Sequence, residues 1–378
     1  MRRAMRRILI SIAFLIVGLS AASATAQVQK TREVIIATRR NHRVVVFDAR
    51  SLSELGHFIV GDLAHSISAS PDGRTLYLEQ PPPSEPNGCC ALFSLDLATA
   101  ALCELIYPSS PAVATPDGRL LFTQRGAVGV EVLDAKSLAR LPVIKAPGNY
   151  GLYVSPDSQW LFGITNWEGP SLDVFDIGRG TLVRRLALPG AVSPLGAWLG
   201  DQFYLYAHDG KQGSLWRLTP DVTELASPKE IAIPIPGRDG KGVWQEMIPA
   251  GNRLILYEAF GWWLKLDRRS KEPEAPGGVF SIDPVTGTFE HLAPATHFAR
   301  LVASSDGSNL YGVDAGTRDA SRPPVLLRIE TKSGTVLKKR NLPIDVWNIS
   351  VARLPEALIP RGRVSTMPCQ NSNAVLSN

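Results

Sequence analysis

The sequence predicts an all-β fold, a seven-bladed β-propeller closed by pairing of its N-terminal and C-terminal strands. Two patterns lead to this prediction: a turn followed by an apolar strand recurs along the chain, and the copies lie about forty to fifty residues apart. The 378 residues include 32 Gly and 29 Pro, which disfavour a helical protein because both residues break helices. A hydrophobic content of 44% with only 20% charged residues excludes a disordered chain.

The first repeated element is a Ser/Thr-Pro-Asp-Gly turn that precedes a short apolar strand. Pro at the second position and Gly at the fourth position favour a type I turn. The turn Ser70–Gly73 leads into the apolar run Thr75–Leu78, and the same order recurs downstream. The further copies are Thr115–Gly118, Ser155–Ser158 and Ser304–Gly307, with degenerate versions at Leu199–Gln202 and Ala250–Asn252.

The second repeated element is an alternating strand that usually ends in Asp or Glu, followed by a hairpin into another strand. Leu172–Asp176 followed by Leu182–Leu186 shows this order. Alternation with period two, bounded by turn residues, is the signal of a half-buried strand. The other alternating strands are Val45–Asp48, Leu92–Asp96, Val130–Asp134, Ser214–Leu218, Val279–Asp283 and Leu326–Glu330.

Alignment of the strand after each turn gives seven units, and six or eight blades are the neighbouring counts. The aligned apolar positions are Ile36, Tyr77, Phe122, Phe162, Leu205, Leu256 and Tyr311, with spacings of 41, 45, 40, 43, 51 and 55 residues. The first unit begins in mid-blade at Val34–Ala37, and the last strand, Val346–Val351, has no partner of its own. We expect that strand to complete the first blade, which leaves no free sheet edge between first and last blades.

The first 26 residues have the features of a secretory signal peptide. A basic start is followed by the apolar run Ile8–Leu19, and Ala24 and Ala26 supply the small residues that a signal peptidase reads. An uncleaved membrane anchor is the alternative, although the run is shorter than the roughly 20 residues that span a bilayer. We therefore expect a signal peptide at 1–26, a propeller at 27–353, a C-terminal tail at 354–378, and a periplasmic or secreted protein.

The signal peptide also accounts for most of the positive charge. The whole chain has a formal charge of +5, from 40 basic and 35 acidic residues. Four arginines and no acidic residues lie in the first 26 positions, so the remainder has 36 basic and 35 acidic residues. Near-neutrality without a basic stripe argues against nucleic-acid binding. No other segment is apolar enough to span a membrane.

Export permits disulfides, and the chain has four cysteines, Cys89, Cys90, Cys103 and Cys369. The predicted hairpin places Cys103 opposite about Ser94, so Cys90 is some four residues out of register. That is too far for a bridge, because bridged Cα atoms lie within about 7 Å. A vicinal Cys89–Cys90 bridge and a bridge to Cys369 are alternatives. A free, buried Cys103 is the default expectation.

Polar and aromatic residues near the starts of the inner strands are the candidates for a binding site at the channel mouth. Ordinary water-filled channel lining is the alternative for each of them. Glu246 with His297 is the one pair that could act as acid and base. The other candidates are His65, Asn149, Tyr150, Trp244, Gln245, Arg300, Trp347 and Asn348.

The connection from Phe260 to Gly277 in the sixth blade is the clearest candidate for a partner interface. Connections longer than about a dozen residues are usually functional or disordered. Aromatic and arginine side chains are enriched at interface hot spots, and here they are Trp262, Trp263, Arg268 and Arg269. The alternative is that the two tryptophans cover the rim of their own blade.

The chain lacks the common catalytic motifs, including G-x-S-x-G, H-E-x-x-H, the P-loop and G-x-G-x-x-G. No His or Cys spacing indicates a metal site or a covalently bound haem. A lactonase or hydrolase of propeller fold would require a metal cluster, for which Glu246, Asn149 and Asp345 are the only sensible ligands. We otherwise predict no metal.

One blade resembles the heavy chain of the amine dehydrogenases (methylamine and aromatic amine dehydrogenases). The resemblance is carried by Gly242–Ile248, Asn252–Tyr257, a long charged loop and Val279–Gly287, and also by Tyr206–Gly210 with Gly213–Leu218. The order, the loop lengths and the signal peptide fit across most of residues 30–353. The Ser-Pro-Asp-Gly turns also resemble the broader YVTN-type propeller group.

The resemblance implies a periplasmic seven-bladed propeller paired with a small, Cys-rich light chain that carries tryptophan tryptophylquinone. The light chain would do the chemistry and pass electrons to a copper protein, while the heavy chain binds no cofactor and walls the substrate channel. This chain departs from the pattern because it has no equivalent of the family's disulfide in the middle blades, nor an assignable channel-lining aromatic residue. A non-catalytic exported propeller that binds protein or glycan partners is therefore the alternative function.

Overall fold

A computed structural model describes most of the chain from Lys30 to Pro368. The described residues are 30–39, 43–60, 66–80, 91–106, 112–124, 128–146, 148, 150–165, 168–188, 191–208, 213–218, 231–233, 244–258, 278–293, 298–314, 323–343 and 346–368. The chain divides into two compact units, residues 1–31 and 32–378. All strands lie in the second unit, apart from Thr31 at the start of the first strand.

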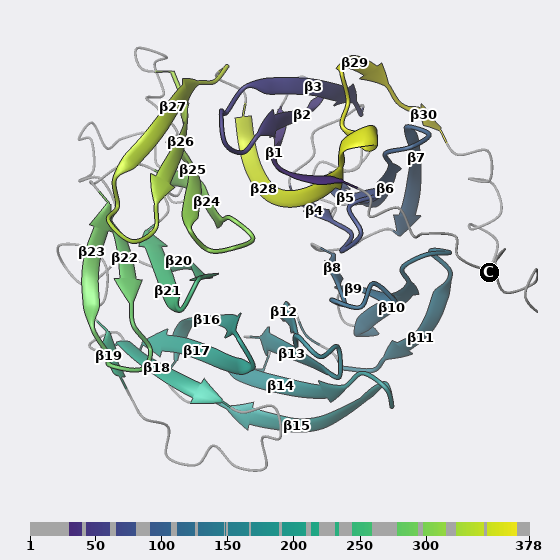
Figure 1. Cartoon of the computed structure of the whole chain (residues 1–378). Helices are drawn as coiled ribbons and strands as arrows, with labels where there is room; N and C mark the ends of the chain where they lie inside the picture. Colours follow the sequence, from purple (N-terminus) through teal and green to yellow (C-terminus); the bar gives the residue numbers. More distant parts are fainter. Residues whose placement is uncertain are drawn as a thin grey trace, which may run out of the picture. The chain divides into compact units, whose positions relative to one another are not determined.

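The second unit is a ring of seven sheets, so the predicted seven-bladed propeller is confirmed (Figure 1). Blade one contains the two ends of the predicted closure: its inner strand comes from the C-terminal part of the chain and pairs with the first strand. From the axis outward the strands are β28 (Val346–Pro355), β1 (Thr31–Arg39), β2 (Arg43–Asp48) and β3 (Glu54–Ile59). The ring is thereby closed through backbone hydrogen bonds.

The other six blades each use four consecutive strands, ordered from the axis outward. Blade two consists of β4 (Ser66–Ala69), β5 (Thr75–Gln80), β6 (Ala91–Asp96) and β7 (Ala101–Ile106). Blade three consists of β8 (Val113–Ala114), β9 (Leu120–Gln124), β10 (Val130–Asp134) and β11 (Arg140–Ile144). Blade four consists of β12 (Tyr150–Val154), β13 (Trp160–Thr165), β14 (Ser171–Asp176) and β15 (Thr181–Ala187).

Blades five to seven repeat the same order. Blade five consists of β16 (Val192–Leu199), β17 (Gln202–His208), β18 (Gly213–Leu218) and β19 (Ile231–Ile233). Blade six consists of β20 (Trp244–Ala250), β21 (Arg253–Glu258), β22 (Val279–Ile282) and β23 (Phe289–Ala293). Blade seven consists of β24 (Phe298–Ala303), β25 (Asn309–Asp314), β26 (Val325–Glu330) and β27 (Val336–Asn341).

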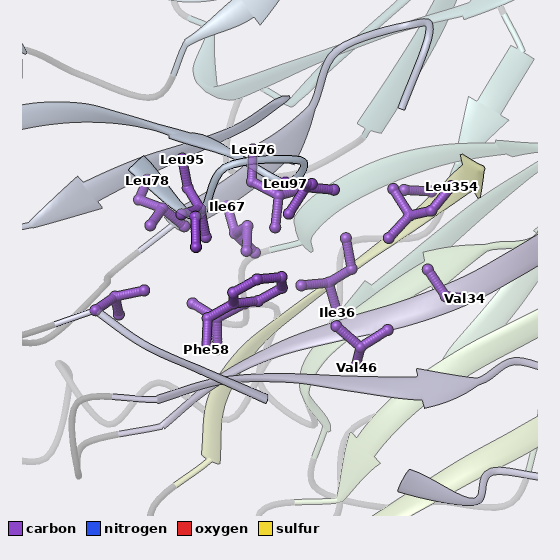
Figure 2. Packing of buried hydrophobic residues seen from close by; sticks show 14 residues of the cluster. Val34, Ile36, Val46, Phe58, Ile67, Leu76, Leu78, Leu95, Leu97 and Leu354 are labelled. Carbon is purple, nitrogen blue, oxygen red and sulfur yellow. The ribbon is translucent and has the colours of Figure 1, made fainter. Parts of the chain in front are cut away.

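The apolar residues of the second strands form the core between blades. All seven positions aligned in the sequence lie in second strands and are at most 2% exposed. In the described part of the chain, most buried apolar residues belong to seven clusters, each joining two neighbouring blades. Figure 2 shows the cluster between blades one and two, where Phe58 of β3 packs among residues such as Ile36 of β1 and Leu95 of β6. Burial between blades, rather than within one sheet, therefore holds the ring together.

The Ser-Pro-Asp-Gly turns have the conformation that the sequence predicts. In each full copy the amide of the fourth residue donates to the carbonyl of the first residue at 2.8–2.9 Å. That fourth residue has a positive φ at Gly73, Gly118, Ser158 and Gly307. The hydroxyl of the first residue donates to the turn Asp, as from Ser304 to Asp306 at 2.6 Å. Each turn therefore satisfies most of its polar groups locally.

The segment after β28 binds back along the outer edges of two blades. A short 3₁₀ turn, η2 (Glu356–Leu358), is followed by β29 (Gly362–Ser365), which pairs in parallel with β3. β30 (Met367–Pro368) then pairs in parallel with β7 and places Pro368 opposite Leu102. These two strands make blades one and two five-stranded.

The expectation of a free, buried Cys103 is wrong, because this half-buried residue forms a disulfide. Its predicted register is confirmed, since Cys103 lies opposite Ser94 in the β6–β7 hairpin. The prediction considered only the β6–β7 hairpin as the surroundings of Cys103. In the structure β30 adds a further strand along the outer edge of β7, the strand that contains Cys103. The other three cysteines, Cys89, Cys90 and Cys369, lie outside the described residues.

The expected signal peptide (1–26) and the long connection from Phe260 to Gly277 also lie outside the described residues, so both stay predictions. In the part of the chain that is described, no helix is of the length and apolar character needed to traverse a lipid bilayer.

Candidate functional site

Three polar side chains meet at the inner strands of blades six and seven. Glu246 lies on β20, Tyr257 on the neighbouring strand β21, and Arg300 on β24. The Tyr257 hydroxyl donates to Glu246 Oε2 at 3.0 Å. An Arg300 guanidinium nitrogen donates to Glu246 Oε1 and forms an ion pair with it. Both carboxylate oxygens of Glu246 are therefore engaged, one within its own blade and one across the blade boundary.

A β-bulge precedes each of the two charged residues. The extra residue is Gln245 in β20 and Ala299 in β24, and Glu246 and Arg300 follow directly. Bulges shift the pairing by one residue and redirect the side chains that follow. The ion pair thus joins equivalent positions of two successive blades, close to the starts of their inner strands. Figure 1 shows both strands beside the axis of the ring.

The pair is only partly covered by protein. The Glu246 and Arg300 side chains keep 30% and 35% of their surface exposed, respectively. The Arg300 Nε atom is buried and has no hydrogen-bond partner among the described residues. An unsatisfied buried N–H group is costly, so it marks a place where a further acceptor belongs. Arg300 therefore combines an exposed portion with unused donor capacity.

The surrounding protein shifts the ionisation of all three groups. Burial raises the pKa of Glu246 above its ordinary value, while Arg300 and the Tyr257 hydroxyl act in the opposite direction. The pKa of Arg300 is raised, because the attraction of Glu246 and Tyr257 outweighs the burial that would lower it. Burial, followed by the charge of Glu246, raises the pKa of Tyr257. Tyr257 is thus a neutral hydrogen-bond donor, and Arg300 is a permanent cation.

Tyr153 on β12 of blade four is a further tyrosine whose ionisation the charge of Glu246 affects. Its hydroxyl accepts a hydrogen bond from the Gly196 amide at 3.3 Å. Burial and the charge of Glu246 raise the pKa of Tyr153 to about 12. Its ring packs edge-on against Phe203, with centroids 5.6 Å apart. The hydroxyl is therefore fixed in place and uncharged at neutral pH.

The structure joins two of the predicted site residues, Glu246 and Arg300, in one ion pair. Glu246 contacts Arg300, whereas its predicted partner His297 lies outside the described residues, so that acid–base pair stays a prediction. Asn348 on β28 is half-buried. Four further candidates lie on inner strands by their backbone positions, namely Tyr150, Trp244, Gln245 and Trp347. The candidates outside the described residues are His65, Asn149, Trp262, Trp263, Arg268 and Arg269.

Tyr257 was not predicted as a site residue, because in the sequence it looks like one more apolar residue of the second strand of its blade. The adjacent alignment position, Leu256, points to the other side of the sheet, and the bulge in β20 brings Tyr257 opposite Glu246. A polar tip on an otherwise apolar strand could have been noticed in the sequence.

In the described part of the chain, no group of three or more His, Cys, Asp or Glu residues is placed to hold a metal ion. Two of the three ligands considered for a lactonase-type cluster, Asn149 and Asp345, lie outside the described residues. The third, Glu246, is engaged by Arg300 and Tyr257.

Comparison with known proteins identifies the fold and not a family. No family model matches the sequence. No functionally curated protein matches it either. The structure is similar to dihydro-heme d1 dehydrogenase NirN in complex with DHE, with a TM-score of 0.53 and 14% identity over 84% of this chain and 74% of that chain.

Two further solved structures are similar over nearly their whole lengths. Hydrazine synthase from Kuenenia stuttgartiensis has a TM-score of 0.52 and 14% identity, covering 80% of this chain and 90% of that chain. A putative 6-phosphogluconolactonase from Bacteroides fragilis has a TM-score of 0.58 and 12% identity, covering 86% and 99%. These similarities are shared by proteins of diverse function, so they identify the propeller fold alone.

Proposed function

We propose that this chain is an exported, non-catalytic propeller that binds a small molecule bearing a carboxylate group at Arg300. The observation that carries the proposal is the state of Arg300, which is partly exposed, anchored by Glu246, and still has an unpaired buried Nε donor. A carboxylate matches the planar, forked donors of a guanidinium better than other small groups do.

The neighbours of Arg300 suit a positioning role. Glu246 holds one edge of the guanidinium, and Tyr257 in turn holds Glu246, so little side-chain freedom remains to be lost on binding. The Glu246 charge neutralises Arg300 overall, which favours a weakly charged or zwitterionic ligand over a polyanion. Binding modules commonly combine such a small set of fixed polar groups with apolar walls.

A heavy-chain-like subunit of a quinoprotein amine dehydrogenase is the second candidate function. It is favoured by the position of Glu246, a partly exposed carboxylate on the inner strand of the blade that carries the sequence resemblance. A carboxylate at that position attracts ammonium groups, the charged form of an amine substrate. In this role the chain requires a small, Cys-rich light chain with tryptophan tryptophylquinone, and a copper protein as electron acceptor.

The two candidates predict binding of opposite ligand classes. We expect a thermal-shift panel to show stabilisation by small monocarboxylates such as propionate or butyrate, and none by alkylamines or arylamines. Arg300→Lys keeps the charge but removes the fork, so it should abolish the carboxylate response. Arg253→Lys is a matched control, because Arg253 contacts Ser281 and Glu290 within the same blade.

The contrary result is stabilisation by amines that depends on Glu246. Loss of the amine response in Glu246→Gln, together with co-purification of a small quinone-bearing chain, would establish the heavy-chain-like role instead. The predicted protein or glycan interface at Trp262, Trp263, Arg268 and Arg269 stays a separate prediction. Deletion of residues 260–277 tests it by partner capture.

A further inference from the structure

A cavity of about 380 Å³ lies where blade seven meets blade one. It is at the opposite end of β24 from Arg300, because Glu33 in its wall accepts a hydrogen bond from the Ser305 amide, in the turn after β24. The residues that line it come from β1, β2, β25, β26 and the hairpin after β2, and they are Arg32, Glu33, Asp48, Ala49, Arg50, Asn309, Tyr311 and Arg328.

The two carboxylates of this cavity already have partners. Asp48 forms an ion pair with Arg32 at 2.6 Å and accepts the Ser51 amide. Glu33 accepts the Ser305 amide at 2.7 Å and the Tyr311 hydroxyl at 3.4 Å. These bonds lower the pKa of Asp48 against the effect of burial. Both acids are therefore occupied by the surrounding protein.

Among the described residues, two of the three arginines have no carboxylate partner. Arg328 donates from Nε to the Asn309 side-chain oxygen at 2.8 Å and from Nη1 to the Arg50 carbonyl at 3.0 Å, and both acceptors are neutral. The exposed Arg50 forms no ion pair within the described part of the chain. Three guanidinium groups face two carboxylates, so the cavity carries a net positive charge.

Arg328 is also the better organised of the two. Its two bonds to Asn309 and to the Arg50 carbonyl fix the guanidinium plane and tie blade seven to the hairpin of blade one. A fixed guanidinium beside a second, unpaired one is the arrangement that proteins use to hold an oxyanion by charge-assisted hydrogen bonds. The cavity is large enough for more than a bare ion, since ligand pockets begin at about 300 Å³.

We infer that this cavity is a second binding site, for a small organic anion whose carboxylate or phosphate group lies between Arg50 and Arg328. The site is independent of the proposed function at Arg300, because the two share no residue and lie on opposite faces of the ring. An anion bound here also contacts both the first and the last blade, so its binding stabilises the closed ring.

Calorimetric titration of the full chain at low ionic strength tests the inference. Inorganic phosphate and succinate serve as the two probes, with Arg50→Gln and Arg328→Gln as variants. We expect at least one probe to bind, and each variant to weaken its binding about tenfold, because each removes a charged donor. Arg119→Gln is the matched control, since Arg119 lies exposed beside the Thr115–Gly118 turn of blade three and pairs with Asp117. It should leave binding unchanged.

The outcomes separate the possible ligand classes. Binding of phosphate alone indicates a phosphorylated ligand, and binding of succinate alone indicates a carboxylate. Arg50→Gln guards the test against misfolding, because the Arg50 side chain, in contrast to that of Arg328, forms no hydrogen bond or ion pair with the described residues. If neither probe binds, or if Arg50→Gln binds as tightly as the unmodified chain, the inference is overturned. Arg300→Lys should not change this titration, so failure here is distinguishable from failure of the proposed function.

Discussion

The Ser-Pro-Asp-Gly turns and the Glu246–Arg300 cluster lie on opposite faces of the ring and are built in different ways. The hydrogen bonds that define each turn close within about six residues, as from Ser155 to Asp157 and from the Trp160 amide to Ser155. Single turn amides also reach the next blade, as from Ser305 to Glu33. The cluster takes one residue from each of three strands in two blades, and its ion pair spans 54 positions. The turn face is thus made of repeated local units, whereas the candidate site depends on how blades are placed against each other.

Because of this difference, substitutions in the turns and at contacts between blades should lower the free energy of unfolding by different amounts. A turn that satisfies itself can be altered with a local cost, unless it also touches the next blade. A substitution at a contact between blades instead disturbs how two blades are placed against each other, so its cost is not confined to one turn.

The largest effect is expected where a turn glycine also contacts the neighbouring blade. In Gly307→Ala the new methyl group would overlap the backbone of Gly251, and φ is +69°. We expect the free energy of unfolding to fall by about 3 kcal/mol or more. Gly118→Ala is the control, with a φ of +70° and no atom within 4 Å of the added carbon, and should cost about 1 kcal/mol. Equal losses in urea unfolding would contradict the distinction.

The next largest effect concerns the link between blades one and two. β30 places Pro368 opposite Leu102, and continuing this register by one residue predicts Cys369 as the disulfide partner of Cys103. Peptide mapping without reduction should recover this pair. Cys103→Ser and Cys369→Ser should each lower the unfolding free energy by about 2–5 kcal/mol. Cys90→Ser is the control and should not; a Cys90–Cys103 peptide would refute the assignment.

A smaller effect is expected at the hydroxyl that supports the candidate site. Tyr257→Phe removes the donor to Glu246 and should lower the unfolding free energy by about 1–2 kcal/mol. Tyr77 is a buried tyrosine of another second strand, and its hydroxyl has no hydrogen-bond partner among the described residues. Tyr77→Phe should therefore be close to neutral. The same loss in both variants, measured by chemical denaturation, would show that ring packing and not the hydrogen bond matters.

The smallest effect is the pH dependence of a single turn. Hydrogen bonds from Ser304 and Ser308 lower the pKa of Asp306 from 3.8 to about 2. The folded state therefore favours the carboxylate, so this stabilisation is complete above pH 4 and is lost as the pH falls toward 2. Asp306→Asn should be less stable than the unmodified chain at pH 6, and the difference should vanish near pH 2. A difference that is constant between pH 6 and pH 2 would contradict the assigned role.

The fold could be predicted from the sequence because its signals are local. The turn chemistry, the strand alternation and the spacing of positions such as Phe122 and Phe162 each involve few residues, and all recur. The candidate site could be predicted only in part. Glu246 and Arg300 were recognisable as polar residues at the starts of inner strands. Their pairing and the role of Tyr257 depend on two bulges and a blade boundary, which no local pattern encodes.

The same reason explains the wrong expectation for Cys103. A hairpin register follows from the turn, but the parallel addition of β30 to β7 joins segments more than 250 residues apart in sequence. This strand lies outside the blade repeat, so no recurring pattern in the sequence indicates its position, in contrast to the pairing of β28 with β1. Both the candidate site and the disulfide therefore belong to the part of the molecule that only the assembled ring defines.

The central claim is that the assembled ring presents Arg300 as the anchor for a carboxylate ligand. Calorimetric titration of the best carboxylate from the thermal-shift panel, against the unmodified chain, Arg300→Lys and Arg328→Gln, tests it most directly. We predict that Arg300→Lys weakens binding at least tenfold, while Arg328→Gln leaves it unchanged. Equal affinities for the unmodified chain and Arg300→Lys would contradict the claim.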